Sequence, residues 1–263
     1  MRKIIYIFLL YLAFACETEY SWELESIPNN SIVVDAIITN ENIAQCIKIS
    51  LPADSLNAPQ LNVSGAIVSV SDGTTIYIFE ESPNNAGAYY SHSFQAVVNK
   101  TYTLEISFRN KTYTASAKMA PLFSNDKYSI DTYNELFRYN QLKTNEPLMI
   151  EVVYDWSAVP EFCFIKNACM AKEFFYILNN VDVNKEIGPN KEVITFPKGT
   201  KIYRKKYSLT DEHQAFLRSL LMETEWKGGL FDVQPGNAIS NISNGGLGFF
   251  AVCTVSTDSL LVY

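Results

Sequence analysis

The sequence is poor in charged residues and has no basic surplus. Charged side chains make up 19% of the 263 residues, and 28 acidic residues against 21 basic ones leave a net charge of −7. Without that surplus, the attraction that dominates nucleic-acid affinity is missing, so we exclude nucleic acid as a partner. Apolar residues are abundant: 48% of the chain is hydrophobic, with 16 Tyr and 16 Phe, which is enough for a folded core.

Residues that carry catalytic or metal chemistry are also scarce. The chain has two histidines, His92 and His213, and no Cys-x-x-Cys pair, so we expect neither a metal site nor a cofactor. It contains no Gly-x-Ser-x-Gly motif, phosphate loop or dinucleotide fingerprint. We expect both histidines at the surface and predict that the protein is not an enzyme. A hydrolase that uses an acid such as Asp232 is the alternative.

The longest apolar run lies at the N-terminus and is too short to cross a membrane as a helix. Arg2 and Lys3 precede it, and it extends from Ile4 to Ala15. This pattern predicts a cleaved signal peptide over residues 1–15. The run ends in Ala-Phe-Ala-Cys, which resembles a bacterial lipobox of the looser kind that is typical of Bacteroidota lipoproteins. We therefore predict that Cys16 carries a lipid; ordinary secretion with a plain thiol is the alternative.

An acidic segment follows the predicted lipid site. Residues 16–26 contain four glutamates, and they resemble the export signal that sends Bacteroidota lipoproteins to the outer face of the outer membrane. We interpret this segment as a tether and expect a protein anchored at the cell surface through its lipid. A plain solvated linker, with the protein facing the periplasm, is the alternative.

Short β-rich runs follow from residue 31 at a spacing of roughly ten residues. In residues 101–108 apolar and polar side chains alternate, which is the pattern of a half-buried strand. Asp72-Gly73 and residues 109–111 supply hairpin turns. About seven strands without a helical period predict an immunoglobulin-like β-sandwich over residues 27–120.

Residues 121–263 are expected to form a β-rich C-terminal domain with one helix. Its first part, to residue 148, is polar and is interpreted as a connection, and residues 162–178 are compatible with strand or helix. The helix is predicted at about 209–224, because Ser208 or Thr210 can cap it and an apolar stripe follows. The stripe consists of Phe216, Leu217, Leu220 and Leu221. Strands are predicted at 148–154 and 247–255, with an edge strand at 260–263.

Four cysteines remain after Cys16, an even number that permits disulfides beyond the inner membrane. Cys163 and Cys169 are the nearest pair, and on a strand their spacing would place both side chains on one face. We therefore consider a disulfide between them. Buried free thiols are the competing interpretation for Cys46 and Cys253.

The best candidate for a binding loop lies between the predicted helix and the last long strand. It combines a glycine-rich entry with an aromatic ring, an acid and a Pro-Gly turn that ends in Asn, and its candidate residues are Phe231, Asp232, Pro235 and Asn237. The alternative is that Asp232 and Asn237 only satisfy the backbone of a loop packed on Trp226. Aromatic residues could also form a platform for a glycan or a peptide, although most should lie in the core. The candidates for this platform are Trp22, Tyr89, Tyr90, Trp156 and Trp226.

Two short motifs resemble the Asp-Ser/Thr-apolar acceptor for O-glycosylation in these bacteria. They place the candidate acceptor hydroxyls at Ser55 and Ser259. Three-residue patterns also recur by chance, so each site is a hypothesis.

Longer stretches resemble the domain of unknown function 4249 family. The most specific are GGLFDVQPGNAISNI (228–242) and LGFFAV (247–252), and VVDAIIT (33–39) and VSGAIVSVSD (63–72) agree in order. The resemblance implies a Bacteroidota outer-membrane lipoprotein of the kind found beside TonB-dependent receptors. It brings no catalytic residues, and it transfers only the lipid-bearing Cys16. The segment 121–200 departs most from the family.

These observations together predict a lipid-anchored accessory or binding protein of the outer membrane, associated with a TonB-dependent nutrient uptake system. A structural or adhesin-like envelope module without a small-molecule ligand is the alternative.

Overall fold

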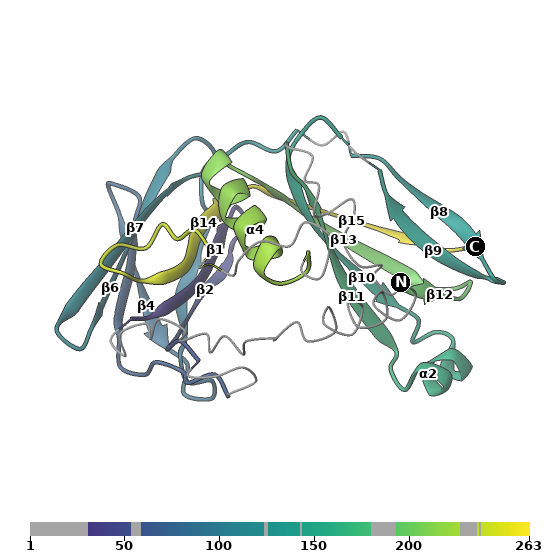
Figure 1. Cartoon of the computed structure of the whole chain (residues 1–263), viewed down its shortest axis with the longest axis horizontal. Helices are drawn as coiled ribbons and strands as arrows, with labels where there is room; N and C mark the ends of the chain where they lie inside the picture. The colour runs from purple at the N-terminus through teal and green to yellow at the C-terminus, as the bar shows by residue number, and fades with distance from the viewer. Residues whose placement is uncertain are drawn as a thin grey trace, which may run out of the picture.

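Strands dominate the fold in the computed structural model (Figure 1). The structure describes residues 31–53, 59–123, 126–142, 144–179, 193–226, 236 and 238–263. Within these ranges the chain forms fifteen strands and two helices. The predicted mainly β class, with a helix in the C-terminal region, is confirmed.

The first sheet has eight strands in the order β14-β1-β2-β5-β4-β3-β6-β7. Its strands are β1 (Val33–Thr39), β2 (Ile43–Ser50), β3 (Ile67–Ser71), β4 (Ile76–Glu81), β5 (Ala88–Phe94), β6 (Thr101–Phe108), β7 (Lys111–Lys118) and β14 (Leu247–Cys253). Neighbours pair antiparallel except β1 and β14, which run parallel. The strand β14 comes from the predicted C-terminal domain but belongs to the sheet of the predicted N-terminal domain. The two domain ranges themselves stay a prediction.

One face of this sheet encloses an apolar core. In β6 the side chains of Tyr102, Leu104 and Ile106 are buried, whereas the alternate side chains are exposed, as the sequence pattern predicts. The two edges of the sheet approach each other, because the Thr114 N–H donates to Ser243 Oγ at 2.7 Å and the Ser243 N–H donates to the Thr114 carbonyl at 2.8 Å. The sheet therefore adopts a barrel-like or sandwich arrangement around its core.

The hairpin turns of the first sheet lie where the sequence placed them. Asp72 accepts the backbone N–H groups of Thr74 and Thr75, and its carboxylate binds Lys100 Nζ at 2.7 Å. The hydrogen bond from Lys100 lowers the pKa of Asp72 well below its usual range. Arg109 and Asn110 both have positive φ, as a two-residue hairpin turn of this hand requires.

The other strands form two smaller sheets. One has the order β11-β10-β13-β15, built from β10 (Leu148–Asp155), β11 (Met170–Ile177), β13 (Lys201–Ser208) and β15 (Val255–Leu261). The other has the order β12-β9-β8, built from β8 (Tyr128–Tyr133), β9 (Leu136–Gln141) and β12 (Thr195–Phe196). The interpretation of residues 121–148 as a connection is therefore wrong. The β8–β9 hairpin is half-exposed on both faces, so its sequence shows little alternation.

A buried charge network lies beneath this hairpin. Arg204 and Lys206 on β13 both bind Asp126 and Asp258, and the two cations are almost fully buried. The Arg204 guanidinium also lies 4.1 Å from the ring centroid of Tyr128. Removing one partner would leave a buried charge uncompensated, so the network fixes how the hairpin sits on the four-stranded sheet.

The predicted C-terminal helix is α4 (Asp211–Glu223). Thr210 is its N-cap, since its hydroxyl accepts the N–H of His213 at 3.2 Å. Leu217 and Leu221 are buried, whereas Leu220, predicted in the same stripe, is 36% exposed. Neither helix in the described parts of the chain is long and apolar enough to cross a membrane.

The ambiguous segment 162–178 contains both kinds of structure. Helix α2 (Pro160–Lys166) ends at Asn167, which adopts a left-handed conformation, and β11 follows. The strand predicted at 247–255 is also divided: it bends at Thr254, and β15 begins at Val255 instead of at residue 260. Here the Thr254 N–H donates to Ser208 Oγ, which replaces the ladder hydrogen bonds lost at the bend.

We predict that Gly248→Ala destabilises the protein by about 3 kcal/mol, measured by urea unfolding. Gly248 has a φ of 82°, and a Cβ there would overlap the carbonyl oxygen of Val34 in the partner strand β1. Gly73→Ala is the matched control, because Gly73 also has a positive φ but nothing lies near its added Cβ. We expect that control to cost about 1 kcal/mol. Equal losses in the two variants would contradict the proposed overlap with β1.

Candidate functional site

A cleft on the first sheet lies over the outer face of β4 and β5. It has a volume of about 790 Å³ and is lined by side chains of both strands and of the turn between them. Ile76 and Ile78 point outward from β4 and are 66% and 55% exposed. The next residue, Phe79, points to the opposite face and is buried in the sheet core. We call this the β4–β5 cleft.

The neighbouring strand β5 supplies polar groups to the same cleft. Tyr90 lies opposite Glu80 in the register and is 40% exposed, and His92 is exposed two residues further along. Tyr77 and Phe94 border the cleft, but their rings stack on each other at a centroid distance of 3.9 Å and pack against the sheet core. The cleft therefore combines aliphatic side chains, aromatic rings, a carboxylate and an imidazole, a mixture suited to binding amphipathic ligands.

Strand pairing limits how a ligand can be held here. Both β4 and β5 are interior strands, because β4 pairs with β3 and β5 pairs with β2. Their backbone groups already belong to the sheet, so a peptide cannot add as a further strand. Recognition in the β4–β5 cleft must come from side chains.

The groups beside the cleft do not form a nucleophile–base pair. Burial raises the pKa of the Cys46 thiol, and the hydrogen bond to this thiol raises the pKa of the Tyr90 hydroxyl. The Glu81 carboxylate is already hydrogen-bonded to the backbone, because it accepts the N–H groups of Gly65 and Gly87. In the described ranges, no group of three or more His, Cys, Asp or Glu side chains is arranged to hold a metal ion.

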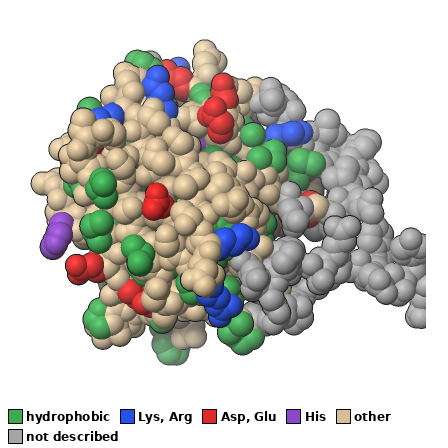
Figure 2. Space-filling model, turned by 90° about the vertical axis from the view of Figure 1, so that its left-hand side faces the viewer, with side chains coloured by type: hydrophobic (Ala, Val, Ile, Leu, Met, Phe, Trp, Pro, Cys, Tyr) green, Lys and Arg blue, Asp and Glu red, His purple; other side chains and the backbone are tan. Residues whose placement is uncertain are grey.

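Figure 2 presents the side of the molecule on which the first sheet lies. Hydrophobic side chains appear there as separate patches among polar and backbone surface, and acidic side chains lie between them. Isolated apolar residues are ordinary on a protein surface. The grouping of Ile76, Ile78 and Tyr90 around a cleft is what distinguishes the β4–β5 region.

A smaller cavity of about 250 Å³ lies at the N-terminus of α4 and contains His213 in its lining. The prediction that His213 lies at the surface is wrong: it is 4% exposed, and its ring stacks on Phe249 at a centroid distance of 5.2 Å. Its Nδ1 lies 3.7 Å from Cys253 Sγ. Burial lowers the pKa of His213 to about 4 and raises that of the Cys253 thiol to about 12, so both groups are neutral near pH 7.

Residues 17–259 match the family described as Domain of unknown function (DUF4249). The chain belongs to the DUF4249 family. A search of curated proteins found no match. Family membership assigns no activity, so the function of this DUF4249 protein has to be argued from the arrangement of its residues.

The four candidate residues of the binding loop in this DUF4249 chain, Phe231, Asp232, Pro235 and Asn237, lie outside the described residues. The described residues Gly236 and Ile239 bind the C-terminal half of α4. The Gly236 N–H donates to Glu223, and the Ile239 N–H donates to Ser219 Oγ. Asn241 then exchanges two hydrogen bonds with the Phe250 backbone, which ties this segment to β14.

Two other predicted sites, Cys16 and Ser55, also lie outside the described residues. Ser259 lies on β15 opposite Tyr203 and is exposed, so a glycosyltransferase could reach its hydroxyl. Among the aromatic platform candidates, Tyr89, Trp156 and Trp226 are buried, Tyr90 lies in the β4–β5 cleft, and Trp22 is outside the described ranges. Most described candidates therefore lie in the core, as expected.

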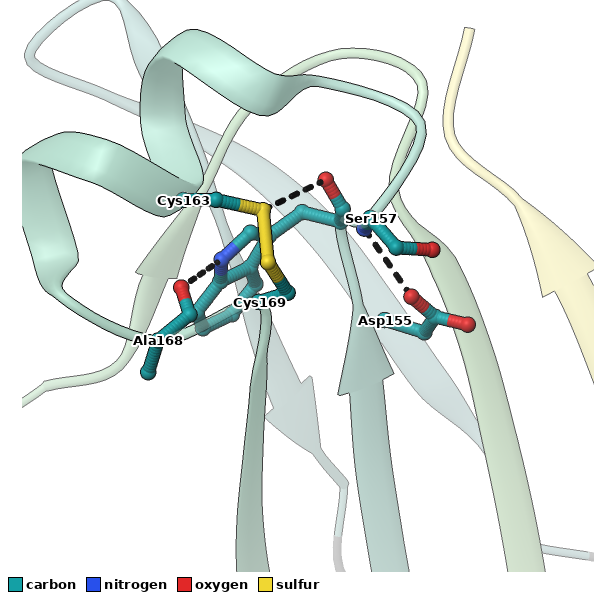
Figure 3. The surroundings of a disulfide bond; sticks show 6 residues. Asp155, Ser157, Cys163, Ala168 and Cys169 are labelled. Atoms are coloured by element: carbon teal, nitrogen blue, oxygen red, sulfur yellow. Dashed lines mark hydrogen bonds between the residues drawn. A yellow bond between two sulfur atoms is a disulfide. The ribbon is translucent and has the colours of Figure 1, made fainter.

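Cys163 and Cys169 are joined by a disulfide (Figure 3). Cys163 is on α2 and Cys169 precedes β11, so the strand argument for their pairing is wrong; a helical turn and a left-handed Asn167 bring the sulfurs together. The Trp156 indole N–H donates to the Ala168 carbonyl at 2.7 Å and packs the disulfide loop onto β10. Cys46 and Cys253 are both free; Cys253 is buried, as the competing interpretation holds, whereas Cys46 is only partly buried.

We predict that protonation of His213 destabilises the fold in acid. The unfolded chain binds this proton near pH 6.5, whereas the folded protein resists it until about pH 4. Stability contributed by neutral His213 is therefore present above pH 6.5 and falls by up to about 3 kcal/mol as the pH drops to 4. Urea unfolding across this range measures the loss.

The variant His213→Phe should flatten this part of the stability profile, because Phe keeps the stacking on Phe249 and cannot titrate. His92→Phe is the matched control, since His92 is exposed. An unchanged slope in His213→Phe would contradict the assignment.

Proposed function

We propose that this DUF4249 protein is a lipid-anchored accessory or binding protein of the outer membrane, at the cell surface, in a TonB-dependent nutrient uptake system. The observation that carries the proposal is the β4–β5 cleft, where Ile76, Ile78 and Tyr90 are exposed together. The signal sequence and lipobox pattern ending at Cys16 support the anchor. The family resemblance supports the receptor as partner.

The cleft supports a peptide or glycan ligand held by side chains. Apolar side chains can pack on the rings or aliphatic parts of such a ligand, and Tyr90 offers a flat surface with a polar tip. Glu80 and His92 flank this surface and supply hydrogen-bonding groups to the ligand. No covalent chemistry is needed, which agrees with the protonated Cys46 thiol beside Tyr90.

An envelope scaffold is the second candidate, and a specific observation favours it. Tyr89, Trp156 and Trp226 are buried, so most large aromatic residues stabilise the fold and are not available to a ligand. A scaffold requires no partner at the β4–β5 cleft. The two functions therefore differ in whether changes in the cleft have an effect.

Affinity purification of the lipidated protein from solubilised outer membranes, followed by mass spectrometry, tests the partner. We expect a TonB-dependent receptor in stoichiometric amount, and we expect Ile78→Asp to lower its recovery, or that of a bound ligand, about tenfold. Ile67→Asp is the matched control: Ile67 is 72% exposed on β3 and does not line the cleft. Recovery of the protein alone, or equal recovery with both variants, would favour the scaffold.

The intact mass of the purified mature protein tests the anchor and the glycan. We expect a chain that begins at Cys16 and carries the added mass of acyl groups, and a Cys16→Ser variant that lacks this mass. A further saccharide mass that disappears in Ser55→Ala or Ser259→Ala would establish O-glycosylation. An unmodified mass would rule out both modifications.

A further inference from the structure

The last turn of α2 carries the most exposed pair of adjacent hydrophobic side chains in the described chain. Phe164 and Ile165 are 89% and 73% exposed, and Met170, at the start of β11, is 54% exposed. We call these three residues the α2 tip. Figure 1 shows α2 at one end of the molecule, away from the first sheet and its β4–β5 cleft.

The α2 tip is held in place from inside. The disulfide between Cys163 and Cys169 closes the segment, and the Ala168 N–H donates to the Cys163 carbonyl at 3.1 Å. Trp156 anchors the base of the tip. The backbone N–H of Trp156 donates to the Cys169 carbonyl at 3.0 Å, and the indole ring packs edge to face on Phe162. Phe164 and Ile165 are therefore presented outward on a braced turn.

Three exposed lysines lie at the end of the four-stranded sheet that carries α2, even though the chain as a whole is acidic. Lys166 follows Ile165 directly, Lys198 lies in the turn beside the start of α2, and Lys201 opens β13; all three are exposed. The nearby acids are Glu161 and Asp155, and Asp155 accepts the Ser157 N–H at 2.9 Å. Lysines therefore outnumber acids here, in contrast to the net charge of −7.

We propose that the α2 tip inserts into the interface of an anionic lipid bilayer. Phe164 and Ile165 would enter the boundary between headgroups and acyl chains, while the lysines reach the phosphates with their ammonium groups. A projecting apolar turn with lysines at the same end of the sheet fits a lipid surface, which needs no preformed pocket. This contact goes beyond the proposed function: it uses a different surface from the cleft, and it adds a second attachment to the lipid expected at Cys16.

Quenching by brominated lipids measures the insertion directly. The lipidated protein, in a Trp22→Phe background, is placed in vesicles of phosphatidylethanolamine and phosphatidylglycerol with brominated acyl chains. Ile165→Trp should show a blue shift and a loss of emission, because its indole enters the interface. Ile67→Trp is the matched control, since Ile67 is 72% exposed on the first sheet. The native Trp156 and Trp226 are buried, and the same protein without the added Trp measures their contribution in each vesicle.

The outcomes separate this inference from the anchor. Quenching of Ile165→Trp and not of Ile67→Trp, weakened by an added Lys166→Glu change, supports insertion. A protein that floats with the vesicles but shows no quenching at position 165 overturns the inference and leaves the anchor intact. A blue shift at 165 that needs solubilised receptor, without quenching by lipid, assigns the tip to a protein partner and also overturns it. Failure to float contradicts both.

Discussion

The parallel pairing of β1 with β14 is the contact on which the first sheet depends. It joins residues more than 200 positions apart, from Val33 opposite Leu247 to Thr39 opposite Cys253. Without β14, the backbone of β1 would be an unpaired edge, and the core side chains Phe250 and Val252 would be missing. Gly248 permits the close approach, because any side chain there would collide with Val34. The sheet that carries the β4–β5 cleft is therefore complete only when β14 has paired with β1.

Local patterns predicted the local structure well. The alternation in residues 101–108 identified β6, Asp72-Gly73 and residues 109–111 identified two hairpins, and Thr210 with its acidic first turn identified the start of α4. Each of these signals depends on neighbours in sequence, through side-chain period, turn conformation or capping. Such rules operate within a few residues and need no knowledge of the fold.

The failures share a dependence on distant partners. His213 reads as a surface residue in the first turn of a helix, but Phe249 and Cys253 of β14 cover it. Residues 121–148 read as a polar connection because the β8–β9 hairpin is half-exposed on both faces and binds buried charges beside its apolar contacts, which the sequence does not reveal. The cleft was missed for a related reason. In residues 76–81 apolar side chains occur on both faces of the strand, so the sequence does not indicate that Ile76 and Ile78 face solvent.

A cluster of hydrogen bonds around Ala120 joins the first sheet to the four-stranded sheet, in addition to the apolar contacts between them. The Ala120 carbonyl accepts the hydroxyls of Ser208 and Thr254, and the Thr254 N–H donates to Ser208 Oγ. Three separate passages of the chain thus share one set of donors and acceptors, and a hinge opening there would break all of these bonds together. These shared bonds oppose a change in the angle between the two sheets, and therefore in the relative direction of the β4–β5 cleft and the α2 tip.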